Sequence, residues 1–209
     1  MEILSSPNQN RPARETFNPL SNFRERRPAR FFIFCLWLAL FYLGLNEARS
    51  QNFSREYPLK AVFLFNFAQF TIWPANAFAS PDSPIVIGIL GDDPFGDVLE
   101  ETVDNEQVNG RKFRVERYPH LEDIKNCQIL FISHSETSHL DKIIKALKDK
   151  PILTVSGIEN AANRGVCISF ITENNKIRLR INTDSLKLAN LTVSSKLLRV
   201  SEITPLPAP

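Results

Sequence analysis

Two aspartates stand directly after an apolar run, where they could hold a small polar or cationic ligand. Asp92 and Asp93 belong to the segment Gly91–Gly96, which follows the run 84–91. Open α/β sheets bind ligands beyond the carboxyl ends of their strands, so the Asp92–Gly96 turn is a candidate ligand site. It is neither a dinucleotide fingerprint nor a P-loop, and two carboxylates would repel a phosphate. The alternative is structural: a turn in which Asp93 caps the helix that follows.

A second polar segment, Ser133–Glu136, holds a serine, a histidine and a carboxylate but lacks a catalytic pattern. The nucleophile elbow G-x-S-x-G is missing. Adjacent side chains of an extended chain point to opposite faces, so Ser133 and His134 are poorly placed as nucleophile and base. We expect Ser135 to be the N-cap of the next helix instead, with Glu136 in its first turn. The sequence therefore predicts no catalytic residue and no enzyme activity.

Metal and cofactor chemistry is not predicted either. No CxxC, CxxH or HExxH spacing occurs, and His134 and His139 are not at the i, i+4 spacing of a helical metal pair. Cys127 and Cys167 could form a disulfide in an oxidising compartment. Two separate buried thiols are the alternative, because a disulfide needs Cα atoms within about 7 Å of each other.

The charge is unevenly distributed along the chain. The net charge is +2, and residues 1–50 contribute seven Arg and four Glu to it. The remaining 18 basic and 19 acidic residues leave 51–209 close to neutral. A near-neutral domain argues against nucleic acid as a partner.

The N-terminal region has the order of an export signal. Residues 1–30 are polar and basic without an apolar period, which predicts a disordered extension. The uncharged run Phe31–Leu45 follows, and Ala48 and Ser50 then occupy the −3 and −1 positions of a cleavage site before Gln51. An uncleaved N-terminal anchor and a buried core helix are the alternatives. We interpret residues 31–50 as a signal peptide, which predicts export to the periplasm.

The elements after this segment alternate between strand and helix patterns. We expect strands at 84–91, 111–118, 126–132, 151–155, 166–171 and 176–181, and helices at 57–73, 98–103, 136–148, 158–163, 184–189 and 194–198. This order predicts an α/β fold, a mainly parallel sheet flanked by helices, with a late antiparallel hairpin at one edge. The domain would span 51–202, followed by a flexible Pro-rich tail at 203–209.

The helix expected at 57–73 is apolar around nearly its whole circumference. Such a helix must be covered on several sides, either within the core or by another chain. The contact surface for a partner would lie near Phe63, Phe67 and Phe70, because large exposed apolar patches mark interfaces. The alternative is that these residues belong to the core.

Several segments resemble the YfiR family, in the same order along the chain. They are Tyr57–Pro74, Ile89–Gly96, Cys127–Ser133, Leu153–Ser156, Glu173–Arg178 and Ser194–Leu198, and together they cover residues 56–200. The resemblance implies a periplasmic, non-enzymatic homodimer that binds the periplasmic domain of a membrane diguanylate cyclase and represses it. It also implies a disulfide from Cys127 to the first strand, where Ile85–Leu90 has no cysteine.

Two functions are therefore expected from different classes of protein. The first is an exported regulator that binds a membrane sensor protein, such as a diguanylate cyclase. The second is a periplasmic small-molecule-binding protein whose site is the Asp92–Gly96 turn.

Overall fold

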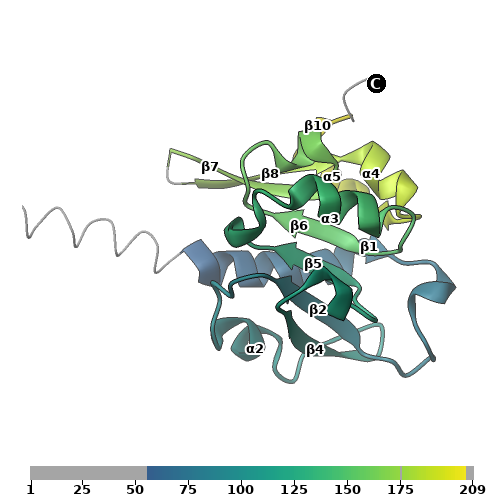
Figure 1. The fold of residues 1–209 in the computed structure, drawn as a ribbon. Coiled ribbons are helices and arrows are strands. Elements are labelled where there is room, and N and C mark those ends of the chain that lie inside the picture. The colour runs from purple at the N-terminus through teal and green to yellow at the C-terminus, as the bar shows by residue number, and fades with distance from the viewer. Residues whose placement is uncertain (1–55, 175, 206–209) are drawn as a thin grey trace, which may run out of the picture. The chain divides into compact units, whose positions relative to one another are not determined.

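Three strands that are buried at every position form the centre of the sheet. They are β2 (Ile85–Leu90), β5 (Ile129–Ile132) and β6 (Leu153–Ser156). Strands of a parallel sheet are buried on both faces, which explains their continuous apolar sequences. The structure is a computed structural model and describes residues 56–174 and 176–205, all within one compact unit (Figure 1). The predicted extension at 1–30 and signal peptide at 31–50 lie outside these residues.

The sheet has the predicted, mainly parallel topology. Its eight strands run in the order β10-β8-β7-β6-β5-β2-β4-β3. β4, β2, β5, β6 and β7 are parallel, and β7 and β8 form the antiparallel hairpin. The outer strands are β3 (Gln107–Val108), β4 (Arg111–Tyr118), β7 (Ile168–Glu173), β8 (Lys176–Asn182) and β10 (Glu202–Thr204). The predicted fold class is confirmed.

The strand β10 was not predicted. It pairs in parallel with β8, outside the hairpin, and places Ile203 and Thr204 in the sheet. The sequence instead predicts a flexible tail at both residues, because a three-residue strand is too short to show an alternation of apolar and polar positions. Residues 206–209 of that tail lie outside the described part of the chain.

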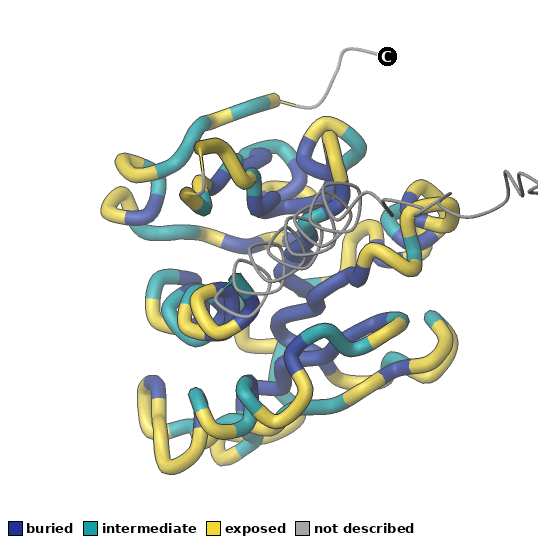
Figure 2. Tube along the Cα trace, turned by 90° about the vertical axis from the view of Figure 1, so that its left-hand side faces the viewer, coloured by how far each residue is buried: buried dark blue, intermediate teal, exposed yellow. Residues whose placement is uncertain are grey.

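Helices cover both faces of the sheet (Figure 1). On one face, the first helix (56–70) and α2 (Val98–Val103) pack on the same core cluster as residues of α4 (Thr183–Leu188) and α5 (Ser195–Arg199). On the other face lies α3 (Leu140–Leu147), which packs on a second cluster. Figure 2 shows the strands as a buried layer between more exposed outer segments. Successive strand residues serve opposite clusters, as the alternation of side chains requires.

Short elements complete the fold. They are β1 (Thr71–Ile72), β9 (Thr192–Val193) and the 3-10 turns η1 (Ala75–Ala77), η2 (Leu121–Asp123), η3 (His134–Glu136) and η4 (Ala161–Arg164). The first helix ends at Phe70 rather than at the predicted Trp73, because β1 pairs with β9. The N-cap of α4 is Asn182, whose side chain accepts hydrogen bonds from the backbone N–H groups of Asp184 and Ser185.

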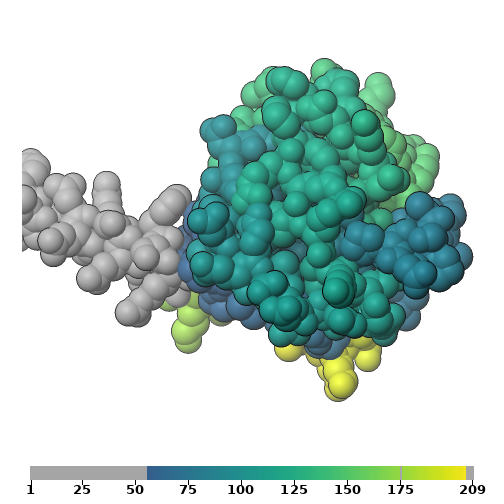
Figure 3. Space-filling model, turned by 90° about the horizontal axis from the view of Figure 1, so that it is seen from below, coloured from purple at the N-terminus to yellow at the C-terminus, as the bar shows by residue number. Residues whose placement is uncertain are grey.

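The buried side chain of Gln128 joins segments at the amino ends of the central strands. Its Oε1 accepts from the Val86 N–H at 2.8 Å, and its Nε2 donates to the Ala77 carbonyl at 2.7 Å. The backbone carbonyl of Gln128 accepts a hydrogen bond from the Trp73 indole N–H at 3.2 Å. Gln128 thereby fixes the loop that carries η1, which projects from the domain at the right of Figures 1 and 3.

We expect Gln128→Leu to lower the free energy of unfolding by about 2–4 kcal/mol, because a buried N–H and a carbonyl lose their partners. Urea denaturation followed by tryptophan fluorescence measures this change. Gln107→Leu, at an exposed position of β3, is the control and should change stability by less than about 0.5 kcal/mol. Equal unfolding midpoints for the two variants would contradict the prediction.

Candidate functional site

The carboxyl ends of β2, β5 and β6 meet at one edge of the sheet. The three strands are adjacent and parallel, so the loops that follow them are neighbours. The Asp92 N–H donates to Ser135 Oγ at 2.9 Å, which ties the first loop to the second. The structure thus brings together the Asp92–Gly96 turn and the Ser133–Glu136 segment, both of which the sequence analysis had selected.

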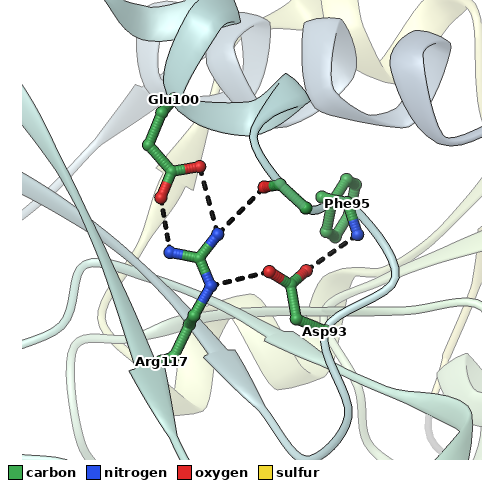
Figure 4. Close-up of polar contacts among 5 residues, drawn as sticks. Asp93, Phe95, Glu100 and Arg117 are labelled. Carbon is green, nitrogen blue, oxygen red and sulfur yellow. Dashed lines mark hydrogen bonds and ion pairs between the residues drawn. The ribbon is translucent and has the colours of Figure 1, made fainter.

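Within the first loop, Asp93 takes part in a clamp centred on Arg117 of β4 (Figure 4). Arg117 Nε contacts Asp93 Oδ2 at 2.7 Å, and Nη2 donates to the Gly96 carbonyl at 2.9 Å. Both terminal nitrogens of Arg117 also reach the carboxylate of Glu100 on α2. The other Asp93 oxygen, Oδ1, accepts from the Phe95 N–H at 2.7 Å. The clamp joins β4, the turn and α2.

The clamp occupies the groups that the sequence analysis had offered to a ligand. Both carboxylate oxygens of Asp93 have internal partners, whereas the Asp92 side chain is exposed. Hydrogen bonds to Glu100 and then to Asp93 raise the pKa of Arg117, and the same contact lowers the pKa of Glu100. The N-cap position of α2 is Asp97 rather than the predicted Asp93. The turn therefore has the features of a structural element, the alternative considered above.

We expect Asp93→Ala to destabilise the domain by about 1–2 kcal/mol, since it removes a charge-assisted contact to Arg117 and the turn's hydrogen bond to Phe95. Thermal or urea unfolding measures the loss. Asp92→Ala serves as the matched control and should leave stability within about 0.5 kcal/mol, because the side chain of Asp92 is exposed. A larger effect at Asp92 than at Asp93 would refute the structural role of the clamp.

In the second loop, Ser135 does not cap the following helix as predicted. Its Oγ lies against Gly91 instead: a Cβ at Gly91 would be 2.3 Å from this oxygen. The φ angle of Gly91 is +86°, so the site requires glycine for both reasons. α3 begins only at Leu140, because residues 134–136 form a 3-10 turn. In the described part of the chain, no hydrogen bond joins the side chains of Ser133 and His134.

Beside these loops lies a cavity of about 400 Å³, which we call the carboxyl-end cavity. It is bordered by the first helix, by the loops that follow β5 and β6, and by β7 and β8. The polar residues that line it include Glu56, Lys60, His134, Asn160, Ser169 and Arg180. No pattern in the sequence predicts this site.

Lys60 on the first helix is the unusual member of this lining, since it is only 2% exposed. Its Nζ lies 2.5 Å from Glu56 Oε1, and 4.9 Å and 5.4 Å from the ring centroids of Tyr57 and Phe170. A buried ammonium is stable only when it is paired, and Glu56 supplies that partner. A sequence signal did exist: Lys60 is the one charged residue in the apolar segment 57–73.

Two further side chains belong to the same cavity. A Cβ at Gly157, directly after β6, would lie 3.2 Å from Lys60 Nζ and 3.3 Å from His134 Nε2. The two nitrogens thus face the same small space beside the glycine. Ser169 Oγ is buried and has no hydrogen-bond partner within residues 56–174 and 176–205. The cavity therefore combines hydrogen-bond donors that internal partners only partly satisfy.

The two cysteines of the domain are free thiols. Cys127 and Cys167 are buried in different core clusters, and burial raises the pKa of both thiols, that of Cys127 to about 12. Cys127 and Cys167 therefore form no disulfide with each other, and each is a separate buried thiol. Gly88 of β2 lies beside Cys127: a Cβ at Gly88 would be 2.8 Å from the Cys127 sulfur.

The three phenylalanines proposed as a partner surface do not form an exposed patch. Phe67 is fully buried and its ring lies 5.9 Å from that of Phe170, while Phe63 and Phe70 are half-buried against the same core. The outward face of the helix instead carries Leu59, 46% exposed, and Val62, 43% exposed. The helix is covered on one side only.

Metal ligands and membrane spans were sought in the described residues. No group of three or more His, Cys, Asp or Glu side chains is placed to hold a metal ion there. Within the same residues, no helix is both long and apolar enough to cross a membrane.

The sequence matches the profile of the YfiR/HmsC-like family over residues 57–202, nearly the whole described domain. The chain belongs to this family, whose members are regulatory rather than catalytic proteins of the periplasm that act in diguanylate cyclase signalling. This confirms the family resemblance seen in the sequence.

Comparisons with other proteins add little to this assignment. No curated protein sequence matches the chain. A crystal structure described as a conserved domain protein from Vibrio cholerae O1 biovar El Tor str. N16961 is partly similar, with a TM-score of 0.43 and 11% identity. The match covers 57% of this chain and 54% of that one, so the chain spans about half the length of that protein.

Proposed function

We propose that the chain is exported and represses a membrane signalling protein, a diguanylate cyclase, by binding its periplasmic domain. The observation that carries the proposal is the family match over residues 57–202. A homodimer is part of the proposal. The competing function, a small-molecule site at the Asp92–Gly96 turn, loses support because both oxygens of Asp93 have internal partners.

Export depends on the N-terminal segment, in which Phe31–Leu45 follows a basic stretch. We expect the chain to accumulate in the periplasm with Gln51 as its first residue, because Ala48 and Ser50 have the small side chains that signal peptidase requires. Cell fractionation followed by N-terminal sequencing measures both points. An intact N-terminus in the membrane fraction would show an uncleaved anchor, and cytoplasmic protein would contradict export altogether.

For the partner contact we propose the outward face of the first helix. Leu59 and Val62 lie one turn apart on this face, on the side opposite to the buried Ala61, Leu64 and Phe67. Apolar residues at this spacing suit a helix face that packs on another protein. Phe67 belongs to the core, so a test that replaces it would measure folding rather than binding.

The double change Leu59→Asp with Val62→Asp should abolish co-purification of the membrane cyclase, because two carboxylates would be buried at the contact. A loss of about 3 kcal/mol would weaken the complex about a hundredfold. Cellular cyclic di-GMP should rise to the level of a strain that lacks the gene. The isolated double variant should unfold at the temperature of the unchanged protein, since both side chains point outward.

Val200→Asp is the control for this experiment, because Val200 is apolar and 73% exposed but lies after α5 rather than on the first helix. It should leave co-purification and cyclic di-GMP unchanged. If Val200→Asp abolishes binding and the double variant does not, the proposed surface is wrong. If deleting the gene leaves cyclic di-GMP unchanged, repression of a cyclase is wrong as well.

A further inference from the structure

We propose that the carboxyl-end cavity binds a small carboxylate ligand, whose carboxylate oxygens accept hydrogen bonds from Lys60 Nζ and His134 Nε2. This inference goes beyond the proposed function and needs no partner protein. It places a small-molecule site next to the Asp92–Gly96 turn instead of on it. The cavity lies beyond the carboxyl ends of β5 and β6, the edge at which open α/β sheets bind ligands.

The first argument is the hydrogen-bonding capacity of Lys60. An ammonium group has three N–H donors. Of the described residues, only Glu56 supplies an acceptor, Oε1 at 2.5 Å, while the rings of Tyr57 and Phe170 lie on other sides. A lysine that is 2% exposed has almost no access to bulk water for its remaining donors. An oxygen from a ligand in the cavity would satisfy them.

The second argument is the position of His134 relative to Lys60. A Cβ at Gly157 would lie 3.2 Å from Lys60 Nζ and 3.3 Å from His134 Nε2, so both nitrogens approach the same side of this glycine. A carboxylate packed beside this glycine at van der Waals distance would present one oxygen to each of the two nitrogens. His134 donates from Nε2 either as the neutral Nε2–H tautomer or as imidazolium. Glycine at position 157 is what keeps this space free.

The third argument is Ser169, which lines the same cavity. Its hydroxyl is buried and has no partner in the described part of the protein, and a buried polar group without a partner costs free energy. Asn160, from the loop after β6, supplies an amide to the same lining. A ligand with a polar group beyond its carboxylate would use these two side chains.

The charges around the cavity favour a single negative charge over a phosphate. Glu56 already balances the charge of Lys60, and Glu159 and Glu173 also line the cavity. Arg180 also lines the cavity, but its guanidinium is paired with Glu202 at 2.8 Å. A doubly charged phosphate would therefore meet three carboxylates, whereas a monocarboxylate places one charge between two nitrogen donors. The volume of about 400 Å³ lies toward the lower end of the range for ligand pockets, so the cavity has room for a small carboxylate and for a body larger than that of acetate.

The test is an NMR titration of protein purified from cells that produce the full chain, with sodium acetate and sodium butyrate as probes. The ring signals of the three histidines report on the site, because His134 lines the cavity and His120 and His139 do not. We expect a saturable shift of the His134 signals alone. Acetamide should cause no shift, and inorganic phosphate should bind at least about tenfold more weakly than acetate.

Gly157→Ala is the decisive variant, since its methyl group occupies the space between Lys60 Nζ and His134 Nε2. We expect it to weaken acetate binding about tenfold or more while the domain keeps its melting temperature within a few degrees. Its binding is followed through backbone amide signals of residues 157–160, so that the readout does not depend on the altered ring environment. His134→Gln should weaken binding too, and His139→Gln is the matched control that should not.

Three results would overturn the proposal: no saturable shift of His134 with either carboxylate, phosphate binding as tight as acetate binding, or unchanged acetate affinity in a folded Gly157→Ala protein. Lys60→Met is informative only where circular dichroism shows a native fold, because it leaves Glu56 without its partner. Carboxylate binding is measured on the isolated chain, whereas repression is measured with the cyclase in cells. Failure of one proposal is therefore distinguishable from failure of the other.

Discussion

Burial of β2, β5 and β6 on both faces is the constraint on which the rest of the structure depends. The strands satisfy their backbone groups by pairing with one another, but their side chains need a helical layer on each side. The first helix and α3 supply those layers. Polar groups that join elements therefore gather at the strand ends. Gln128 does so at the amino ends, and the Arg117 clamp does so at the carboxyl ends.

The first helix shows how one segment can serve both the core and the surface. Its inner face supplies Phe67 to the core and Lys60 to the carboxyl-end cavity, while Leu59 and Val62 face outward. The all-round apolar sequence reflects these two roles rather than complete burial. Because consecutive residues of an α-helix are about 100° apart, Lys60 and Leu59 point in different directions, so a ligand and a protein could contact the same turn together.

The sequence predicted the fold class because continuous apolar runs and their alternation with helical segments are local signals. It also predicted the family, because the matching segments extend along the whole domain. Contacts that depend on strand order were not predictable. Arg117 meets Asp93 only because β4 lies beside β2, and Lys60 and His134 reach the same side of Gly157 only because the first helix packs beside the loops that follow β5 and β6. The exposure of the three phenylalanines was misjudged, since an all-apolar sequence does not show which face the sheet covers.

The two polar clusters at the carboxyl edge differ in how fully their groups are paired, and that difference separates scaffold from candidate site. Both carboxylate oxygens of Asp93 already accept hydrogen bonds within the protein, so this side chain is a poor ligand-binding group. Within residues 56–174 and 176–205, Lys60 has one acceptor for its three donors, and the Ser169 hydroxyl has no partner. Buried polar groups in native proteins are almost always paired. Thr71 and Ser185 also have a buried hydroxyl without a partner in the described residues, but the cavity combines such a hydroxyl with a buried ammonium. Ordered water could fill it, but water carries no charge, and the facing nitrogens of Lys60 and His134 favour an anionic oxygen over a neutral one.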